Sequence, residues 1–496
     1  MKTFSLGGIH PHDNKLSARK PFKVVALPDV AIFPLEQHIG APAKPIVAVG
    51  DKVLAGQMIA EAGGFVSAPV HSSVSGTVQK IATFTDGWGF DKMAIHIKVE
   101  GSEWIENIST DNNLRSECNL SSEEIIKKIA DAGIVGLGGA CFPTQVKLMP
   151  PKDMHVDTLI INAVECEPYL THNHQLMLEK PAEVLMGVRI LMQALNIKKA
   201  IIGIEANKMD AVELLKGELI KEKGECLHEV SANNTSVPEP VESLCKPSAE
   251  SKTVPELVEG PSFELSRGEA KDIKVPEVKV VPLKLKYPQG GEKQLIEALT
   301  GRKVPNGGIP AAVGCVVQNV GTAFAVYEAV QLNKPLVEVM MTVTGPSVTN
   351  PGNFIVRIGT PIEKVLEMAG GIPADTGKII GGGPMMGKTY SHTNHPVSKR
   401  SSGLLLLPND MAAPLEEKNC IRCGKCVQNC PMGLAPYLLA TQGEMALWDD
   451  MEKEQVANCI ECGCCTFTCP SNRPLLDYIR YGKQTVMANI RARASK

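Results

Sequence analysis

Two rows of cysteines near the C-terminus constrain this chain more than any other feature. Both rows have the spacing C-x2-C-x2-C-x3-C-P, in which three thiolates wrap one iron–sulfur cube and the fourth reaches the other cube. The pattern predicts a helical domain with two [4Fe-4S] clusters. One cluster would be held by Cys420, Cys423, Cys426 and Cys469, and the second by Cys459, Cys462, Cys465 and Cys430.

Structural zinc and disulfides are the alternatives for these cysteines. Zinc sites usually use two separated C-x2-C pairs instead of a run of four. Cys464 is out of register in the second row, and we do not expect it to be a ligand. Because iron–sulfur clusters carry single electrons, the chain is predicted to transfer electrons.

The composition argues against several classes of function. A chain of 496 residues should form several domains. A net charge of −3, 4% aromatic residues and no basic run interleaved with aromatics argue against nucleic-acid binding. The N-terminus lacks an apolar signal segment, and no run of about 18 apolar residues could span a membrane. Thiolate ligands need a reducing compartment, so we expect the cytoplasm.

Short apolar runs broken by turn residues over residues 40–80 predict a module of short strands, within a first domain at 1–115. Residues 68–78 resemble the barrel-sandwich pattern of biotinyl and lipoyl domains. Those domains carry a modifiable lysine at the central hairpin, whereas His71 and Ser72 occupy this turn. We therefore expect a docking or structural module.

Residues 116–335 alternate between helix and strand patterns and predict an α/β domain. Helices are expected over 121–130, 181–195 and 294–300, and strands over 157–162 and 199–204. Residues 229–279 are rich in Pro, Glu and Ser without a sustained apolar period. We expect them to form a disordered surface insertion.

Three segments complete the chain. Residues 336–405 combine strand patterns with one capped helix between Gly359 and Gly371, which predicts a β-grasp-like, ligand-binding-like module. The ferredoxin-like two-cluster domain is expected over 412–480, followed by a basic tail over 481–496. The tail is either a solvated helix face or a docking element for an acidic partner or anionic lipid.

A glycine-rich loop from Gly136 to Lys147 is the second strong signal. Clustered glycines let backbone N–H groups approach a phosphate, and Lys147 adds a positive charge. Glycine turns are common, so this loop alone is weak evidence for a phosphate-binding site. Polar segments at 162–168, 291–292 and 318–322 strengthen it.

Together these motifs resemble the flavin- and NADH-binding subunit of respiratory complex I. The resemblance is carried by the glycine loop, the Asn-x-x-Glu-x-Glu-Pro segment from Asn162 and the Asn-Val-x-Thr segment from Asn319. Further motifs indicate, more narrowly, the C subunit of the Rnf ion-translocating electron-transport complex. They are Gly7-Gly8-Ile9-His10-Pro11, the barrel-sandwich module, Phe142-Pro143-Thr144, Tyr287-Pro288-Gln289-Gly290-Gly291-Glu292-Lys293 and the paired cysteine rows. The resemblance covers the chain apart from 229–279.

The resemblance implies non-covalent FMN and NAD(H) beside the two clusters. Matched by motif, the cofactor-binding residues are Gly136, Gly138, Gly139, Lys147 and Thr322 for the FMN phosphate, Asn162 and Asn319 for the flavin or ribityl chain, and Gly291. Glu165, Glu167 and Glu292 would shape the flavin and nicotinamide face and are the candidate catalytic residues.

Two residues depart from the family pattern. Cys141 stands where the family usually has a small residue, often glycine, and we expect it to narrow the approach to the phosphate. Val164 stands where the complex I subunit has an acidic residue.

The function implied is that of a peripheral subunit on the cytoplasmic face of the cell membrane, attached through other Rnf subunits, including ferredoxin-like ones. Electrons would pass between NADH, FMN and the two clusters in either direction, coupled elsewhere to ion transport. One alternative is a soluble flavin and iron–sulfur protein similar to cobalamin reductase. Another is an iron–sulfur relay scaffold with a vestigial flavin site.

Overall fold

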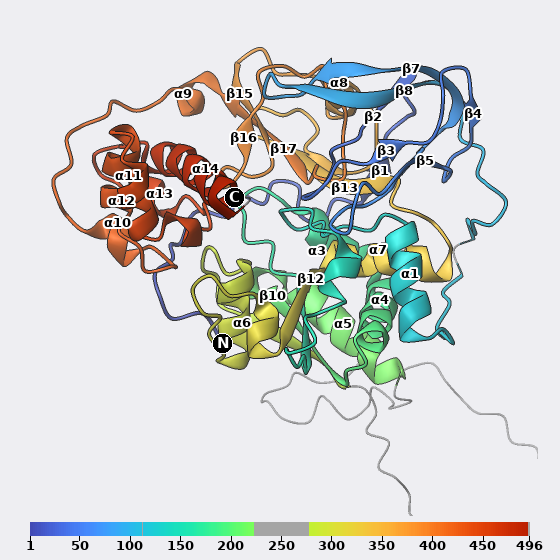
Figure 1. Cartoon of the computed structure of the whole chain (residues 1–496), viewed down its shortest axis with the longest axis horizontal. Coiled ribbons are helices and arrows are strands. Elements are labelled where there is room, and N and C mark those ends of the chain that lie inside the picture. The colour runs from blue at the N-terminus through green and yellow to red at the C-terminus, as the bar shows by residue number, and fades with distance from the viewer. Residues whose placement is uncertain (112, 223–276, 495–496) are drawn as a thin grey trace, which may run out of the picture.

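The computed structural model describes residues 1–111, 113–222 and 277–494, and Figure 1 shows their arrangement. The chain forms four parts: two small N-terminal sheets, a parallel α/β layer, a six-stranded sheet and a helical C-terminal part. Residues 229–276 of the expected insertion lie outside the described residues. Residues 277–279 are the start of strand β11, so the boundary predicted at 279 is three residues too late.

The N-terminal part consists of two facing antiparallel sheets. One has the order β2-β8-β7-β4 and the other β3-β5-β6. Their strands are β2 (Val30–Pro34), β3 (Lys44–Pro45), β4 (Lys52–Val53), β5 (Met58–Glu61), β6 (Val70–His71), β7 (Ser75–Thr85) and β8 (Asp91–Gly101). The hairpin around Ser73 is buried, and the Ser73 Oγ donates a hydrogen bond to Ile358 O at 2.6 Å. This hairpin therefore faces protein, in keeping with a structural module.

The α/β layer has four parallel strands in the order β11-β10-β9-β12. The strands are β9 (Thr158–Asn162), β10 (Lys199–Glu205), β11 (Glu277–Leu283) and β12 (Cys315–Asn319). The helices are α1 (Ser122–Asp131), α2 (Thr144–Lys147), α3 (His172–Glu179), α4 (Pro181–Ala194), α5 (Met209–Glu222), α6 (Glu292–Thr300) and α7 (Val320–Gln331), with 3-10 turns η1 (Ala206–Lys208) and η3 (Pro310–Val313). Alternate residues of β9 enter two cores: Leu159 and Ile161 join α4 and α7, whereas Ile160 joins α6. Helices thus cover both faces of the layer.

The six-stranded sheet has the order β1-β14-β13-β17-β15-β16. Its strands are β1 (Phe22–Val24), β13 (Glu338–Thr344), β14 (Gly352–Arg357), β15 (Thr376–Gly381), β16 (Lys388–Thr389) and β17 (Gly403–Pro408), with helices α8 (Ile362–Met368) and α9 (Asn409–Ala412). The helix expected between Gly359 and Gly371 is α8. The edge strand β1 comes from residues that we expected inside the first module.

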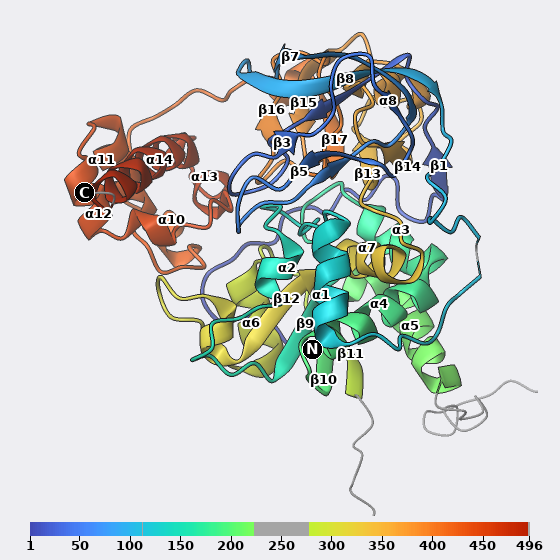
Figure 2. The same ribbon diagram turned by 45° about the vertical axis from the view of Figure 1, so that its right-hand side comes forward.

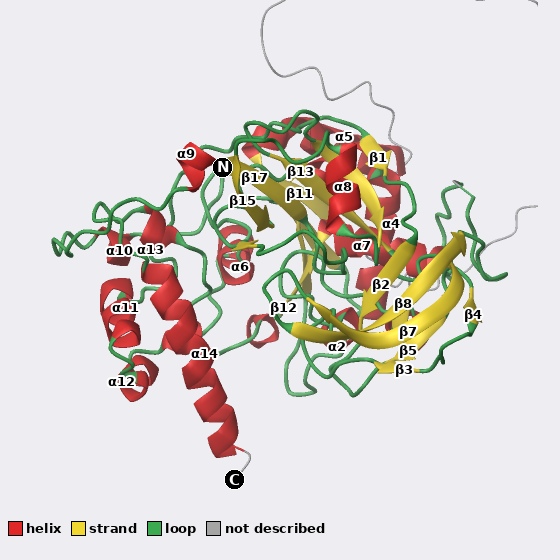
Figure 3. Ribbon diagram, turned by 90° about the horizontal axis from the view of Figure 1, so that it is seen from above, coloured by secondary structure: helices red, strands yellow, loops and turns green. Residues whose placement is uncertain are grey.

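The C-terminal part contains α10 (Lys425–Gln428), α11 (Pro436–Glu444), α12 (Trp448–Lys453), η4 (Val456–Asn458), α13 (Cys464–Phe467) and α14 (Leu475–Ala494). It lies beside the rest of the molecule and is joined to the six-stranded sheet by an extended segment (Figure 2). Figure 3 shows α14 as one long helix ending at the C-terminus. Residues 481–494 therefore continue a helix that begins at Leu475, and they do not form a separate tail.

The first 24 residues run across three of these parts. Lys2 forms a bridge with Leu283 in the α/β layer, and the Gly8 N–H donates to Asn429 O in the C-terminal part at 3.0 Å. The segment then ends as β1, which pairs in parallel with β14 over Asn353–Ile355.

Candidate functional site

Two asparagines meet at the carboxyl ends of neighbouring strands. Asn162 ends β9 and Asn319 ends β12, and the two are register partners. Strand β9 lies between β10 and β12, so the chain reverses its direction of winding there, which is where α/β sheets bind ligands. The structure thus brings together two predicted site residues that are 157 positions apart.

The glycine loop lies over the N-terminus of α7. The Leu137 N–H donates to Thr322 Oγ1 at 2.9 Å, and Asn319 caps the helix by accepting from the Gly321 N–H at 2.8 Å. A Cβ added to Gly138 would lie 2.7 Å from Asn319 Nδ2, so only glycine allows this approach. A helix N-terminus beneath exposed backbone amides is suited to an anion.

Three glycines form the loop itself. The Gly136 N–H donates to Phe142 O at 2.9 Å and closes its base, whereas Gly138 and Gly139 are exposed. Gly139 has φ 155° and no heavy atom within 4 Å of an added Cβ. The tip is therefore an open cradle of main chain, and this fits a phosphate bound by N–H groups.

Lys147 and Glu292 form an ion pair. Lys147 Nζ lies 2.8 Å from Glu292 Oε1 and also donates to Val317 O at 3.1 Å. Both side chains are partly exposed, so the pair adds little to stability. The two predicted site residues are thus in contact with each other, and the phosphate role of Lys147 stays a prediction.

Asn162 also holds the loop that precedes α6. Its Nδ2 donates to Gly290 O at 2.8 Å, and the Gly290 N–H donates to Cys166 Sγ at 3.3 Å. The next residue, Gly291, is the N-cap of α6. Segments 162–166 and 290–291 are therefore one connected structure beside the asparagine pair.

The carboxylate of Glu165 does not face an open site. It accepts the N–H groups of Asn173 at 2.8 Å and His174 at 3.3 Å, at the start of α3. Burial acts to raise the pKa of Glu165, but His172, Lys15, Lys208 and the Asn173 N–H outweigh it, and the pKa is lowered. Our expectation that Glu165 shapes the flavin face is corrected: its side chain is only 2% exposed and serves as a helix cap.

The carboxylate of Glu167 is also directed into protein. It accepts the N–H of Met386 at 2.8 Å and of Met385 at 3.2 Å, and the Tyr287 hydroxyl lies 3.4 Å away. Loss of water around the carboxylate raises the pKa of Glu167 to about 7. The expectation for Glu167 is corrected in the same way, because its partners belong to the turn after β15. Of the three predicted glutamates, Glu292 is the one whose carboxylate contacts another predicted site residue, Lys147.

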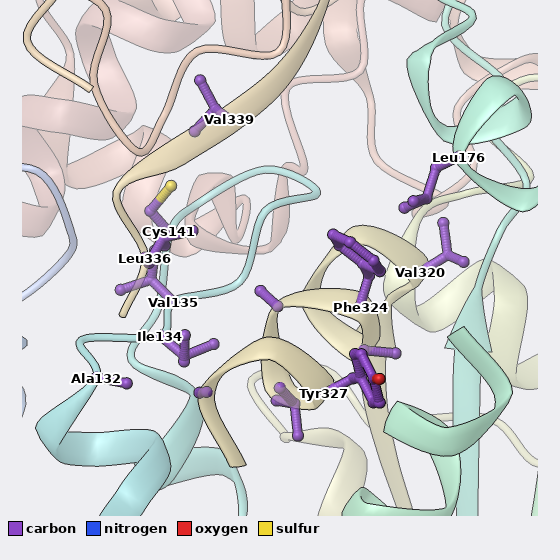
Figure 4. Close-up of a cluster of buried hydrophobic side chains, with 14 of the residues drawn as sticks. Ala132, Ile134, Val135, Cys141, Leu176, Val320, Phe324, Tyr327, Leu336 and Val339 are labelled. Carbon is purple, nitrogen blue, oxygen red and sulfur yellow. The ribbon is translucent and has the colours of Figure 1, made fainter. Parts of the chain in front are cut away.

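Cys141 is turned away from the glycine loop. Its Sγ donates to Lys399 O at 3.4 Å, and the side chain is 1% exposed. Figure 4 shows it among Val135, Leu336 and Val339. The expected narrowing of the phosphate approach is therefore wrong. Cys141 has φ 52°, a conformation that favours glycine.

Sequence reasoning missed Lys15, which fixes the loop after β9. Its Nζ donates to the carbonyls of Glu165, Glu167 and Leu170 at 3.0, 2.7 and 2.8 Å. Burial lowers the pKa of Lys15 to about 8. No sequence pattern could have identified it, because its partners are main-chain groups 150 or more residues away.

Cysteines of the second row line one cavity. The cavity is lined by Cys459, Cys462 and Cys465 together with Cys430 of the first row. Burial raises the pKa of Cys459 to about 11 and that of Cys465 to about 12. This arrangement fits a cube that takes its fourth ligand from the other row.

The first row is more open. Cys420 and Cys423 are exposed, and Cys426 is half-buried. Burial raises the pKa of Cys426. Within the described residues no three His, Cys, Asp or Glu side chains are close enough for a single metal ion. A cube has a wider ligand set, because each thiolate binds a different iron.

The comparisons with known proteins match this layout in chain order. Residues 2–102 match the family model of the RnfC barrel sandwich hybrid domain, and 129–328 match that of the Nuo51 FMN-binding domain. Residues 340–389 match the SLBB domain, and 414–470 match the 4Fe-4S dicluster domain. The chain is also 42% identical to the C subunit of the proton-translocating ferredoxin:NAD(+) oxidoreductase complex of Clostridium ljungdahlii, over 97% of this chain and 94% of that protein. This chain belongs to the RnfC family.

Other C subunits are similar to this chain over nearly its whole length. The chain is 40% identical to the C subunit of the Na(+)-translocating ferredoxin:NAD(+) oxidoreductase complex of Acetobacterium woodii, over 98% of this chain and 97% of that protein. It is 38% identical to the C subunit of the ion-translocating oxidoreductase complex of Klebsiella pneumoniae, and covers 57% of that longer protein. The predicted resemblance and multidomain fold are confirmed. No helix in the described part of this Rnf subunit is long and apolar enough to cross a membrane.

Proposed function

We propose that this Rnf subunit exchanges electrons between NADH, FMN and two [4Fe-4S] clusters, within a membrane complex that couples the transfer to ion transport. The observation that carries the proposal is the glycine loop over the N-terminus of α7, in the same chain as two cysteine rows. The family supports it, because two of its members are C subunits of proton-translocating and Na(+)-translocating ferredoxin:NAD(+) oxidoreductase complexes.

The flavin phosphate is assigned to the open loop. Its N–H donors would come from Gly138, Gly139 and the first turn of α7, while Asn319 and Thr322 hold the loop and helix together. Asn162 would orient the flavin or ribityl chain from the end of β9. Lys147 and Glu292 would lie at the same edge of the sheet, and in the proposal Lys147 supplies the positive charge. When bound, the flavin would accept a hydride, and with it two electrons, and would pass these electrons on one at a time.

In the proposal, each cluster is held by the first three cysteines of one row and by the fourth cysteine of the other row. Cys459, Cys462 and Cys465 would share one cube with Cys430, which lines the same cavity. Cys420, Cys423 and Cys426 would share the other with Cys469.

The second-row cluster would be the one nearer the flavin. Cys462 and Cys464 pack in one apolar cluster with Ile9 and Tyr287, against Cys166. Cys166 and Gly290 belong to the segments fixed by Asn162. Because Cys420 and Cys423 are exposed, the first-row cluster would lie at the surface, where another Rnf subunit would exchange electrons with it.

We also propose peripheral attachment at the cytoplasmic face of the cell membrane through other subunits. Several basic side chains of the C-terminal helix are engaged within the chain. Lys483 Nζ donates to Cys459 O and Glu461 Oε1 at 2.8 and 2.9 Å, and Arg493 is paired with Glu452. These pairs favour the solvated-face interpretation of the basic residues over docking to anionic lipid.

The test is anaerobic purification, followed by flavin and iron analysis and reduction by NADH. The proposal expects one FMN and about eight irons per chain, with clusters that become reduced on addition of NADH. Protein that carries both clusters but binds no FMN, and whose clusters NADH never reduces, would establish the relay scaffold instead.

A further inference from the structure

A glycine turn connects the SLBB domain to two other parts of the molecule. The turn, residues 382–387, joins β15 to β16. On one side Glu167 accepts the N–H groups of Met385 and Met386 at 3.2 and 2.8 Å. A Cβ added to Gly383 would lie 2.3 Å from Glu167 Oε2, so this contact requires glycine at position 383.

The same two methionines contact the cluster domain through their carbonyls. Arg480 of α14 donates to Met386 O at 3.1 Å. A Cβ added to Gly463, between two second-row cysteines, would lie 2.8 Å from Met385 O. The Met385 side chain also packs against the apolar cluster that contains Cys462. The turn is therefore held between the loop after β9 and the second cysteine row.

The cluster domain also contacts the rest of the molecule at other places. Residues 413–424, which connect it to the SLBB domain, form no helix or strand (Figure 2). Polar contacts elsewhere run from the Gly8 N–H to Asn429 O, from Gln294 Nε2 to Pro431 O at 3.3 Å, and from the Gly307 N–H to Asn458 Oδ1 at 3.0 Å. A carboxylate placed against protein needs strong partners, and the two amides of the turn provide them. The contact is therefore one of several polar junctions that hold the cluster domain, and it is the junction made through the SLBB domain.

We infer that Glu167 is a positioning residue that clamps the 382–387 turn and so fixes the distance between the flavin loop and the second cysteine row. The SLBB domain then acts as a spacer between the two cofactor sites. The inference rests on the proposed function. Electron tunnelling slows steeply with distance, so a loosened clamp slows transfer between the sites without altering either site itself.

The primary test is Gly383→Ala in the holoprotein, with Gly217→Ala as the matched control. The new methyl group displaces the Glu167 carboxylate, whereas the Gly217 position in α5 has no atom within 4 Å of an added Cβ. Hydrogen exchange at the Met385 and Met386 amides should become at least about tenfold faster in Gly383→Ala, a loss of roughly 1.4 kcal/mol of protection. Glu167→Gln leaves one fewer acceptor and should accelerate exchange at the same amides.

A kinetic measurement separates the clamp from the chemistry. NADH oxidation releases NAD+, a proton and two electrons, and each cluster takes up one electron. In Gly383→Ala, flavin bleaching by NADH should keep the wild-type rate and iron content should be unchanged, while cluster reduction slows by about tenfold or more.

Unchanged exchange and unchanged cluster reduction in Gly383→Ala would overturn the inference. Slowed cluster reduction with unchanged exchange at Met385 and Met386 would also overturn it, because the clamp would then be intact. If wild-type protein binds no flavin, the proposed function fails, and exchange at the two amides still reports whether Glu167 holds the turn.

Discussion

Gly138 and Asn319 are packed so closely that a single methyl group on Gly138 would lie 2.7 Å from the Asn319 Nδ2. This contact seats the glycine loop on the cap of α7, and the Leu137 N–H to Thr322 hydrogen bond lies beside it. The loop and the helix N-terminus thus form one unit, assembled from segments far apart in the sequence.

The variant Gly138→Ala should weaken FMN binding by about tenfold or more, because the loop must move away from α7 and lose at least one charge-assisted hydrogen bond. The measurement is a titration of apoprotein with FMN, followed by flavin fluorescence. Gly217→Ala serves as the control and should bind as wild type does. Equal affinities for the Gly138→Ala variant and wild type would remove the loop from the flavin site.

Lys147→Ala should weaken FMN affinity by about 10- to 150-fold, since a charge-assisted contact is worth roughly 1.5–3 kcal/mol. Lys92→Ala is a suitable control, because Lys92 also has a carboxylate partner, Glu36 at 2.6 Å, but belongs to the N-terminal sheets. Both variants should retain their iron. Normal FMN binding by Lys147→Ala would show that the charge of Lys147 pairs with Glu292 and does not contribute to phosphate binding.

Cys430→Ser should damage the cluster of the second row, although Cys430 belongs to the first, because its thiol lines the second-row cavity. Cys464→Ser is the matched control: Cys464 lines the same cavity yet is out of register. We expect about eight irons per chain in Cys464→Ser and fewer in Cys430→Ser. Electron paramagnetic resonance of the reduced protein identifies the cluster lost. Loss of the first-row signal in Cys430→Ser would reverse the assignment.

Lys399 should give the protein a pH-dependent stability. Its Nζ donates to Pro69 O and Gly133 O at 2.8 and 2.7 Å, and burial lowers its pKa from 10.5 to about 7. Between these values the unfolded chain holds the proton and the folded chain does not, so stability rises with pH across this window by at most ~1.4 kcal/mol per pH unit.

Thermal unfolding of wild type and Lys399→Met, compared from pH 7 to 9.5, measures this contribution. The difference in Tm should shift in favour of wild type as the pH rises, because the variant lacks the titrating group. Other groups titrate in both proteins and cancel in the comparison. A difference in Tm that stays constant over this range would mean that Lys399 keeps an ordinary pKa in the folded protein.

Local patterns in the sequence predicted local structure well. Ser121 and Glu124 form the capping box expected before α1, and β9 and β10 lie where apolar runs were found. The pairing of Asn162 with Asn319 follows from the rule that parallel strands present their carboxyl ends at one edge. These features depend on neighbouring residues or on a general property of α/β layers.

The hydrogen-bond partners of long side chains could not be predicted from the sequence. Glu165 and Glu167 lie in one loop, yet the first caps α3 and the second holds a turn of the SLBB domain. The partners in both cases are main-chain amides, which every residue carries and no sequence pattern marks. Cys141 was misjudged for a related reason, because its φ of 52° directs the side chain into the core. Strand β1 has three residues, too few to show a period.

The path of the first 24 residues has a consequence for how the chain is made. The partners of these residues are synthesised much later than the residues themselves: Leu283, then Asn353–Ile355, then Asn429. Strand β1 and the Gly8 contact therefore have to wait until most of the polypeptide exists, while later segments fold around their own cores. Docking of this early segment is therefore completed only after Asn429 of the cluster domain has been synthesised.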